Sequence, residues 1–486
     1  MSSLSRRKFL QGTAAMPLAL WLSRNAFAQS APFIRYDIAS PQGADMLATY
    51  ANAMRTMLTR TETDPTSWLW QWYIHFVNGA TTKANEVTRI FGTEVTPLST
   101  LANEIWNTCQ SHSGQNTNYF LPWHRMFVLF FEQIIREVSG RADFALPYWD
   151  YTSSDPLKRG ILPIQFRSRL DPVFGVLYRA DRLALANGGQ RIDKNQPTDQ
   201  MDITAAMQTL DYSNVGTVQG FCRAIDSGIH GRIHVLVGNA KNMGAVPYAA
   251  RDPLFWVHHA SIDRMWASWN AQGRVNPVMA SWTTKVFVFA DRTGQRVTGR
   301  IRDFFDTTTL GYAYDSLIPP VAPKAKASAT VTRIAASTTK AELGAAATTL
   351  TIRRLPGVTQ DANILGLAST SSSLRTFLVL KDLHTWKQPE TLFHVYLAPS
   401  GNGVSKNAYV GAINFFDAEF HDHGGGSALD SALGENFFSF DVTDLLRRYE
   451  RSGVKARDAL SLTIVPGGQP RKDAGAMIAS VELVRQ

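Results

Sequence analysis

The chain has 486 residues, of which 44% are hydrophobic and 18% are charged, with a formal net charge of +9. At about 150 residues per domain, this length predicts two or three structural units. The composition excludes a disordered, collagen-like or small disulfide-rich protein, and no apolar run reaches the roughly 18–20 residues that span a bilayer.

The N-terminal segment is typical of an export signal. Arg6 and Arg7 precede an apolar stretch over 14–22, and Ala26-Phe27-Ala28 matches an A-x-A cleavage pattern. We expect a twin-arginine signal over 1–28, and a periplasmic or secreted protein that uses the twin-arginine export machinery. Because that segment holds four basic and no acidic residues, the remaining chain has 45 basic against 40 acidic residues, or +5. This charge is too small and too evenly spread to indicate nucleic-acid binding.

Apolar residues recur at helical spacing between residues 44 and 270. The pattern predicts a mainly α domain whose helices cover Ala44–Thr59, Thr66–Val77, Pro122–Val138, Ser227–Val237 and Pro253–Trp269. The third helix carries proline near its start and Gly140 just beyond its end, as helices often do.

The composition changes after Tyr314. Residues 318–345 are rich in Pro, Ala, Ser, Thr and Lys, which predicts a linker. Seven alternating or β-branched runs then predict short strands at Thr349–Ile352, Thr376–Leu380, Leu392–Leu397, Ala408–Asn414, Phe437–Val442, Ser461–Val465 and Ser480–Val484. Their number and spacing predict an antiparallel β-sandwich over 346–486.

The chain contains eleven histidines but only two cysteines, so a metal site would use nitrogen or oxygen ligands rather than a thiolate framework. Seven histidines fall in the helical half, and bundle interiors are where facing helices build metal sites. His230 and His234 are four residues apart on a predicted helix, which places both imidazoles on one face. A site of nearly pure imidazole suits copper or zinc, and six histidines would serve two ions.

Two long strings resemble the copper signatures of the tyrosinase, catechol oxidase and molluscan haemocyanin family. Asp252–Trp266 (DPLFWVHHASIDRMW) resembles the second signature. Phe120–Arg125 (FLPWHR), with Glu132 eight residues after its histidine, resembles the first. The resemblance covers about residues 44–314 and closes at a Tyr-x-Tyr, while parts of the later chain resemble the C-terminal domain of plant polyphenol oxidases.

The resemblance implies a four-helix bundle around two copper ions, and an enzyme of residues 29–317 that oxidises o-diphenols to o-quinones with O2. It implies that one copper is held by His75, His112 and His124, and the other by His230, His234 and His259. His258 is then a neighbour of the second copper. Asp263 and Arg264 are expected to orient ligands or cap their helix, because ligand histidines need a partner on the other ring nitrogen.

The segment around His112 departs from the family pattern. Seven residues separate His112 from Phe120, where the family usually has four or five. Many relatives link this histidine to a cysteine through a thioether, commonly in Cys-x-His, whereas here Cys109 lies three residues before it. A thioether, a disulfide with Cys222 and a free buried thiol are the alternatives.

The substrate side of the site also departs from the family. Relatives that hydroxylate monophenols well often carry Asn after the first histidine of the second copper, with a Glu nearby, but here Gly231 follows His230. Asp226, one helical turn earlier, could replace the Glu. Val246 matches a position where plant enzymes often have a bulky Phe gate. We therefore expect strong diphenol oxidation and weak or absent monophenol hydroxylation.

Other functions are compatible with the same residues. They are a haemocyanin-like oxygen carrier, an o-aminophenol oxidase, and a non-catalytic exported protein that binds carbohydrate or another surface. The resemblance implies that residues 346–486 cover the copper entrance and keep the enzyme latent, with a plain stability or docking domain as the alternative.

Overall fold

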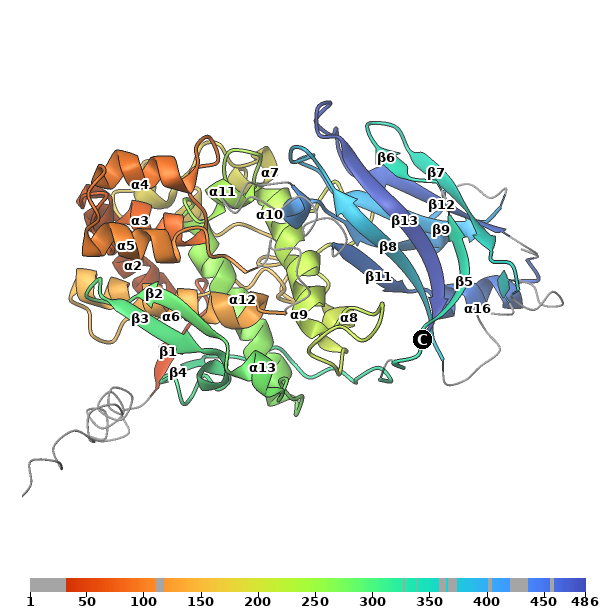
Figure 1. Cartoon of the computed structure of the whole chain (residues 1–486), viewed down its shortest axis with the longest axis horizontal. Helices are drawn as coiled ribbons and strands as arrows, with labels where there is room; N and C mark the ends of the chain where they lie inside the picture. Colours follow the sequence, from red (N-terminus) through yellow and green to blue (C-terminus); the bar gives the residue numbers. More distant parts are fainter. Residues whose placement is uncertain are drawn as a thin grey trace, which may run out of the picture.

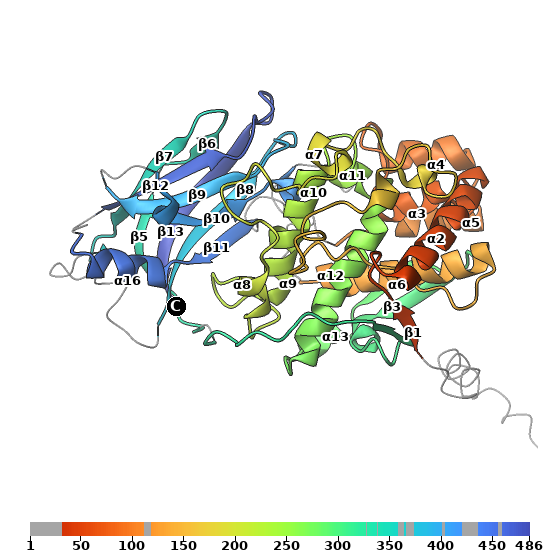
Figure 2. The same cartoon turned by 180° about the vertical axis from the view of Figure 1, so that it is seen from behind.

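The computed structural model describes residues 32–110, 118–326, 328–337, 339–357, 364–365, 374–400, 404–419, 436–454 and 459–486. The predicted export signal and His112 lie outside these residues. Figures 1 and 2 show two domains side by side, one helical and one made of strands. No helix of the described part is long and apolar enough to cross a membrane.

The helical domain confirms the predicted fold class. Its longer helices are α2 (Pro41–Thr59), α3 (Trp68–His75), α4 (Lys83–Phe91), α5 (Pro97–Ile105), α6 (Phe120–Ser139) and α12 (Leu254–Ala271). Shorter segments are α7 (Ala184–Asn187), α8 (Thr204–Met207), α9 (Phe221–Arg223), the π-helical turn η3 (Ala224–His230), α10 (Gly231–Val237), α11 (Val246–Ala249) and α13 (Ala280–Thr283).

Local sequence sets the ends of these helices. Ser40 caps α2 by accepting a hydrogen bond from the Gly43 amide, and Pro41 occupies its first turn. α6 ends at Gly140, whose φ of 67° is the left-handed conformation that glycine adopts readily. Most of α6 and α12 is buried, and the two helices pack against each other.

Two small sheets tie the helical domain together. β1 (Phe33–Arg35) pairs in parallel with β4 (Tyr312–Tyr314), so the start of the described chain meets the end of this domain. β2 (Val286–Ala290) and β3 (Arg296–Arg300) form an antiparallel hairpin.

The strands of the second domain form one sheet of nine members. They are β5 (Thr332–Ser337), β6 (Ala341–Leu343), β7 (Thr348–Arg354), β8 (Thr376–His384), β9 (Phe393–Pro399), β10 (Tyr409–Ile413), β11 (Phe437–Asp441), β12 (Ala459–Pro466) and β13 (Ala476–Arg485). The order is β10-β9-β12-β7-β5-β13-β8-β11, with β6 also on β13, and every pairing is antiparallel. Because β10 also contacts β11, the sheet curls into a nearly closed barrel.

This arrangement refines the expected antiparallel β-sandwich. All seven predicted strands are present, but they belong to one curled sheet instead of two facing sheets. β5 and β6 lie inside the range 318–345 that the composition marks as a linker, because pairing with β13 stabilises strands that are too short and too alanine-rich to stand out. A helix that the pattern did not predict, α16 (Thr443–Arg451), buries Leu445 and Leu446 in the barrel core.

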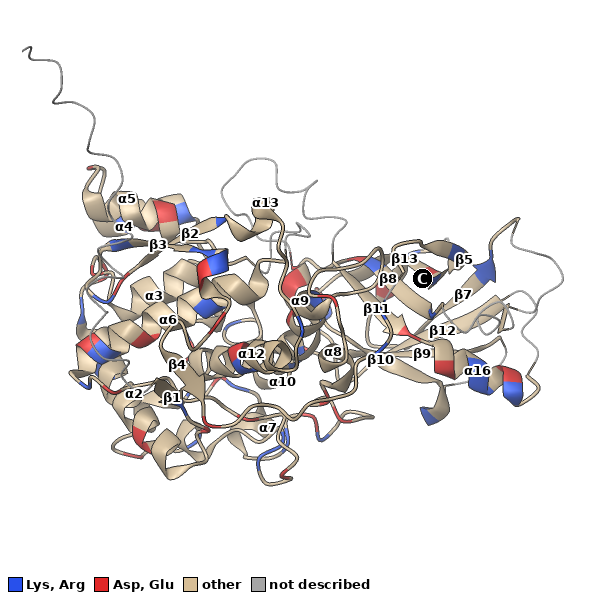
Figure 3. Ribbon diagram, turned by 90° about the horizontal axis from the view of Figure 1, so that it is seen from below, with Lys and Arg blue, Asp and Glu red and all other residues tan. Residues whose placement is uncertain are grey.

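The two domains share an extensive seam. The apolar core of the helical domain includes three residues of the barrel domain, Leu392, Ala412 and Phe416. At another point of the seam, the Gln486 side chain accepts from Thr217 and donates to the carbonyl of Val215. Along the described part of the ribbon, Lys and Arg alternate with Asp and Glu (Figure 3).

Candidate metal centre

Five helical segments bring six histidines together. His75 ends α3, His124 lies in the first turns of α6, and His230 and His234 lie on consecutive turns of η3 and α10. His258 and His259 follow each other on α12. Each of these side chains is at most 2% exposed, so the imidazoles form a dry, nitrogen-rich centre inside the bundle.

The ligand atoms fall into two groups. The first contains His75, Cys109 and His124, and the second contains His230, His234, His258 and His259; within each group the atoms lie within 4.8 Å of one another. The rings of His124 and His259 are nearly parallel with centroids 4.4 Å apart, which joins the two groups. Two ions could therefore sit next to each other. His112, the expected third ligand of the first group, lies outside the described residues.

Hydrogen bonds made by the Nδ1 atoms of three histidines fix the tautomer of each ring, and so the state of its Nε2 atom. Nδ1 of His124 donates to the carbonyl of Phe120 at 2.9 Å, and Nδ1 of His234 donates to that of Met243 at 2.6 Å. Nδ1 of His230 donates to the carbonyl of Asp226 at 3.1 Å. In this tautomer Nε2 carries a lone pair, as metal coordination requires. Nε2 of His230 and His234 has no hydrogen-bond partner among the described residues, so the donors fit a metal that prefers imidazole.

Burial also sets the protonation state of these histidines. It lowers the pKa of His75, His234, His258 and His259 well below the ordinary value, and lowers the pKa of His124 to about 3. Removal of an imidazolium from water is unfavourable, so all five are neutral near pH 7. Neutral imidazole is the form that binds a metal.

His258 and His259 occupy different places in the second group. The ring of His259 stacks on that of His124 in the first group, whereas the ring of His258 lies 5.5 Å from that of Tyr151. Both are close to His230, at 5.7 Å for His258 and 5.1 Å for His259. His258 and His259 thus both belong to the second group, and His259 is the one whose ring stacks on His124 of the first group.

The three residues expected on the substrate side lie close to the ligands. Asp226 is 3% exposed, and its carboxylate lies 3.3 Å from Nδ1 of His230 and 3.2 Å from the Arg223 guanidinium. Gly231 is the first residue of α10. Val246 is fully buried, and its backbone faces His75.

Both cysteines are buried, and the described structure contains no Cys109–Cys222 disulfide. The Cys109 sulfur lies 3.6 Å from Nε2 of His124. The Cys222 sulfur lies 3.4 Å from the carbonyl of Asn118, and burial raises its pKa to about 12. Whether Cys109 bonds to His112 stays a prediction.

Asp263 and Arg264 are both buried on α12, the helix that carries His258 and His259. The Asp263 carboxylate accepts hydrogen bonds from Tyr312 at 2.7 Å and Tyr314 at 2.6 Å, and pairs with Arg35 and Arg125. Burial alone would raise its pKa, but the two guanidinium charges outweigh burial and lower it. Arg264 binds the carbonyl of Ser316 at 2.7 Å and the Asp150 carboxylate at 3.1 Å. These contacts anchor the helix that carries His259.

The barrel domain contributes a side chain that the sequence interpretation did not identify. The ring of Phe416, in η6 (Phe416–Ala418), is parallel to the imidazole of His234 at 4.0 Å, and lies edge-on to His230 at 5.4 Å. Phe416 is 1% exposed. The Gln388 amide holds its turn by donating to the carbonyls of Phe415 and Phe416, each at 3.1 Å. In the sequence, the only feature that could have pointed to Phe416 is the pair of consecutive phenylalanines, Phe415 and Phe416, shortly after a predicted strand.

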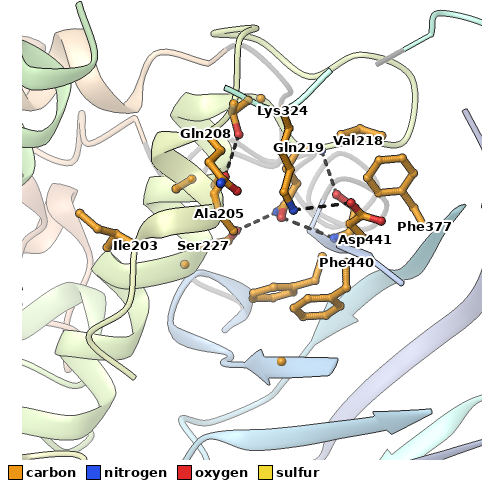
Figure 4. Close-up of a pocket in the computed structure, with 18 of the residues that line it drawn as sticks. Ile203, Ala205, Gln208, Val218, Gln219, Ser227, Lys324, Phe377, Phe440 and Asp441 are labelled. Carbon is orange, nitrogen blue, oxygen red and sulfur yellow. Dashed lines mark hydrogen bonds and ion pairs between the residues drawn. The ribbon is translucent and has the colours of Figure 1, made fainter. Parts of the chain in front are cut away.

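A cavity of about 510 Å³ lies in the same seam, outside the histidine centre. Figure 4 shows Gln219 and Ser227 of the helical domain opposite Phe440 and Asp441 of the barrel. The Gln219 amide donates to the Ser227 hydroxyl at 2.8 Å and to the carbonyl of Phe437 at 2.7 Å. No histidine lines this cavity, so it is separate from the metal centre.

Sequence comparison identifies the family. The common central domain of tyrosinase matches residues 65–170 and 177–272, and the polyphenol oxidase middle domain matches residues 280–326. The chain belongs to the tyrosinase family. Over 466 residues it is 28% identical to tyrosinase HcTyr1 of Hahella sp. (strain CCB-MM4), covering 90% of this chain and 96% of that protein. Over 258 residues it is 27% identical to polyphenol oxidase C of Solanum lycopersicum, covering 44% and 40%.

Solved structures share the tyrosinase-family architecture over both domains. Latent apple tyrosinase aligns with a TM-score of 0.61 at 21% identity, covering 94% of this chain and 98% of that one. A functional unit of octopus haemocyanin aligns with a TM-score of 0.51 at 17% identity, covering 93% and 99%. The chain is thus an oxidoreductase of the tyrosinase and polyphenol oxidase family, in which a type 3 dicopper site is implied and two histidine-rich clusters are present.

Proposed function

We propose that the chain oxidises o-diphenols to o-quinones with O2 at two copper ions. The two adjacent groups of buried, neutral imidazoles carry this proposal. One copper is assigned to His75, His112 and His124, and the other to His230, His234 and His259. Bound copper would supply the redox chemistry by taking electrons from the phenol and passing them to O2.

The chain's own residues orient the ligands and keep water out. The Phe120 ring lies 4.6 Å from the rings of both His124 and His230, and Phe255 lies 4.1 Å from His259. Asp226 accepts the Nδ1 proton of His230 with its backbone oxygen, and its carboxylate lies on the same side. These apolar walls and fixed tautomers favour a reaction in a water-poor site.

The preferred substrate is a diphenol, with little hydroxylation of monophenols. Gly231 provides no side-chain amide beside His230. The Asp226 carboxylate already contacts Arg223 and His230. The test loads the mature chain with copper and compares kcat/KM for catechol with that for a matched monophenol. Rapid turnover of the monophenol without a lag would contradict the preference, and no turnover of catechol would contradict the function.

The alternatives have the same copper centre but a different output. A haemocyanin-like carrier would bind O2 reversibly without turning over catechol, and an o-aminophenol oxidase would prefer an aminophenol to catechol at equal concentration. Likeness to the octopus haemocyanin unit concerns the fold alone. The same kinetic comparison, extended to an o-aminophenol, separates these functions.

The barrel domain is proposed to shield the copper site through Phe416. Its ring covers His234 inside the core of the helical domain, where a phenol would have to approach. Substitution Phe416→Ala in the full chain should raise kcat/KM for catechol about tenfold or more, because the substrate no longer competes with the ring. An unchanged kcat/KM would reject shielding and favour a plain stability role.

Export through the twin-arginine route is proposed on residues 1–28 alone. The double substitution of Arg6 and Arg7 to Lys should keep the protein in the cytoplasm, whereas the native chain should appear in the periplasm or medium. Fractionation of expressing cells measures this, and export of both forms would refute the route.

A further inference from the structure

Gly231 has no conformational need for glycine. Its φ of −62° and ψ of −34° are ordinary helical values, and alanine in a helix is favoured over glycine by about 0.5–1 kcal/mol. Glycine is required at this position because another side chain packs directly against its Cα. A Cβ at position 231 would lie 2.8 Å from Cγ and Nδ2 of Asn414 and closer still to Oδ1.

Asn414 cannot easily move away. It is 4% exposed, and its Nδ2 donates to the carbonyl of Ser227 at 2.8 Å. Its Oδ1 accepts from the amide of Phe416 at 3.2 Å. One buried amide therefore binds the π-helical turn that leads to His230 and also fixes the turn that carries Phe416. A shift of this side chain would leave buried polar groups without their hydrogen bonds, which is unfavourable.

We propose that Asn414 is a positioning residue for the dicopper site, and that the absence of a side chain at Gly231 provides the space that the Asn414 side chain occupies. Asn414 sets how deeply Phe416 enters over His234, and the bare Cα of Gly231 lets the barrel domain approach that closely. The inference rests on the proposed shielding, and it names the residues that control it.

The seam near Ser227 supports this role. The Ser227 hydroxyl accepts from Gln219, which also binds the carbonyl of Phe437 in the barrel domain (Figure 4). Ser227 is therefore held by the barrel domain directly through Asn414 and indirectly through Gln219. Because the next four residues include His230, the docked position of the barrel and the placement of a copper ligand are coupled.

The test uses the copper-loaded full chain with Gly231→Ala. We expect kcat/KM for catechol to rise about tenfold or more, and faster hydrogen exchange of residues 409–418, because the added methyl group forces Asn414 and its turn away. Gly344→Ala is the matched control, since a Cβ there meets no atom within 4 Å. The control should match the native chain in both measurements.

A double-mutant cycle with Asn414→Ala separates positioning from general destabilisation. If Gly231→Ala acts by colliding with Asn414, it should have little further effect in the Asn414→Ala background. Additive effects would overturn the proposal, and so would native exchange and kinetics in Gly231→Ala. If Gly231→Ala speeds exchange without raising activity, the contact with Asn414 is supported but shielding is refuted. If Phe416→Ala raises activity while Gly231→Ala changes neither measurement, shielding is supported but the role of Gly231 and Asn414 is refuted.

Discussion

Nε of Arg35 lies 2.8 Å from the Glu132 carboxylate, and both side chains are completely buried. The pair joins the first described strand to α6, the helix that carries His124. The same guanidinium reaches the Asp263 carboxylate at 3.0 Å on α12 and packs 3.8 Å from the centre of the Tyr312 ring. The two helices that face each other across the metal centre are therefore fixed by one cation from the N-terminal strand.

Removal of this cation should destabilise the copper-free chain strongly. In Arg35→Met, Glu132 and Asp263 each lose a buried partner, and loss of one member of a buried pair typically lowers the free energy of unfolding by about 3–5 kcal/mol. Denaturant unfolding measures the change. Arg292→Met is the matched control, because Arg292 pairs with Glu137 on the same helix but both are at least half exposed; its effect should stay within about 0.5 kcal/mol. Equal effects of the two substitutions would contradict this account.

Copper content tests the ligand assignment one residue at a time. His124→Ala and His234→Ala should each lose one of the two bound copper ions, because each removes one of three imidazoles from one site. His259→Ala should lose the second copper, whereas His258→Ala should retain both ions if His258 only neighbours the site. Elemental analysis of purified protein gives the ratio of copper to chain. Loss of copper from His258→Ala but not from His259→Ala would show that His258 is the ligand and His259 the neighbour.

Short sequence motifs made much of the site predictable. His124, His230, His234 and His259 lie in long sequence strings or at one-turn spacing, and the helices that carry them have clear periodicity. Asn414 and Phe416 could not be found this way, because they act on residues about 180 positions earlier and only the folded chain brings them there. β5 escaped prediction for a related reason, since its partner β13 is the last strand of the sheet.

Cys109 should form a thioether only when copper is present. The bond would join its sulfur to an imidazole carbon of His112, with two hydrogens removed by O2 at the copper site. Mass spectrometry of the copper-loaded protein should show a crosslinked peptide lighter by two hydrogens, absent from Cys109→Ser and present in Cys222→Ser. Separate native peptides in the copper-loaded, air-exposed protein would show that the extra residue between Cys109 and His112 prevents the bond.

The barrel domain should lose stability as the pH rises through neutrality. Burial raises the pKa of Glu419 from its ordinary value of 4.5 to about 7, against smaller lowering effects of Gln388, Arg471 and Lys387. Tyr248 of α11 faces Glu419 across the seam. Because the folded chain holds this proton more tightly than the unfolded chain, the stabilisation is complete below about pH 4.5 and is lost as the pH rises through about 7.

Glu419→Gln should remove that loss, since glutamine stays neutral. The variant and the native chain should have similar Tm values at pH 4.5, and the variant should unfold at a higher temperature at pH 8.5. For a domain of this size, each kcal/mol corresponds to about 2–4 °C. Glu450→Gln, at an exposed position of α16, should leave the profile of Tm against pH unchanged. Parallel profiles for Glu419→Gln and the native chain would show that this carboxyl does not govern the stability of the seam.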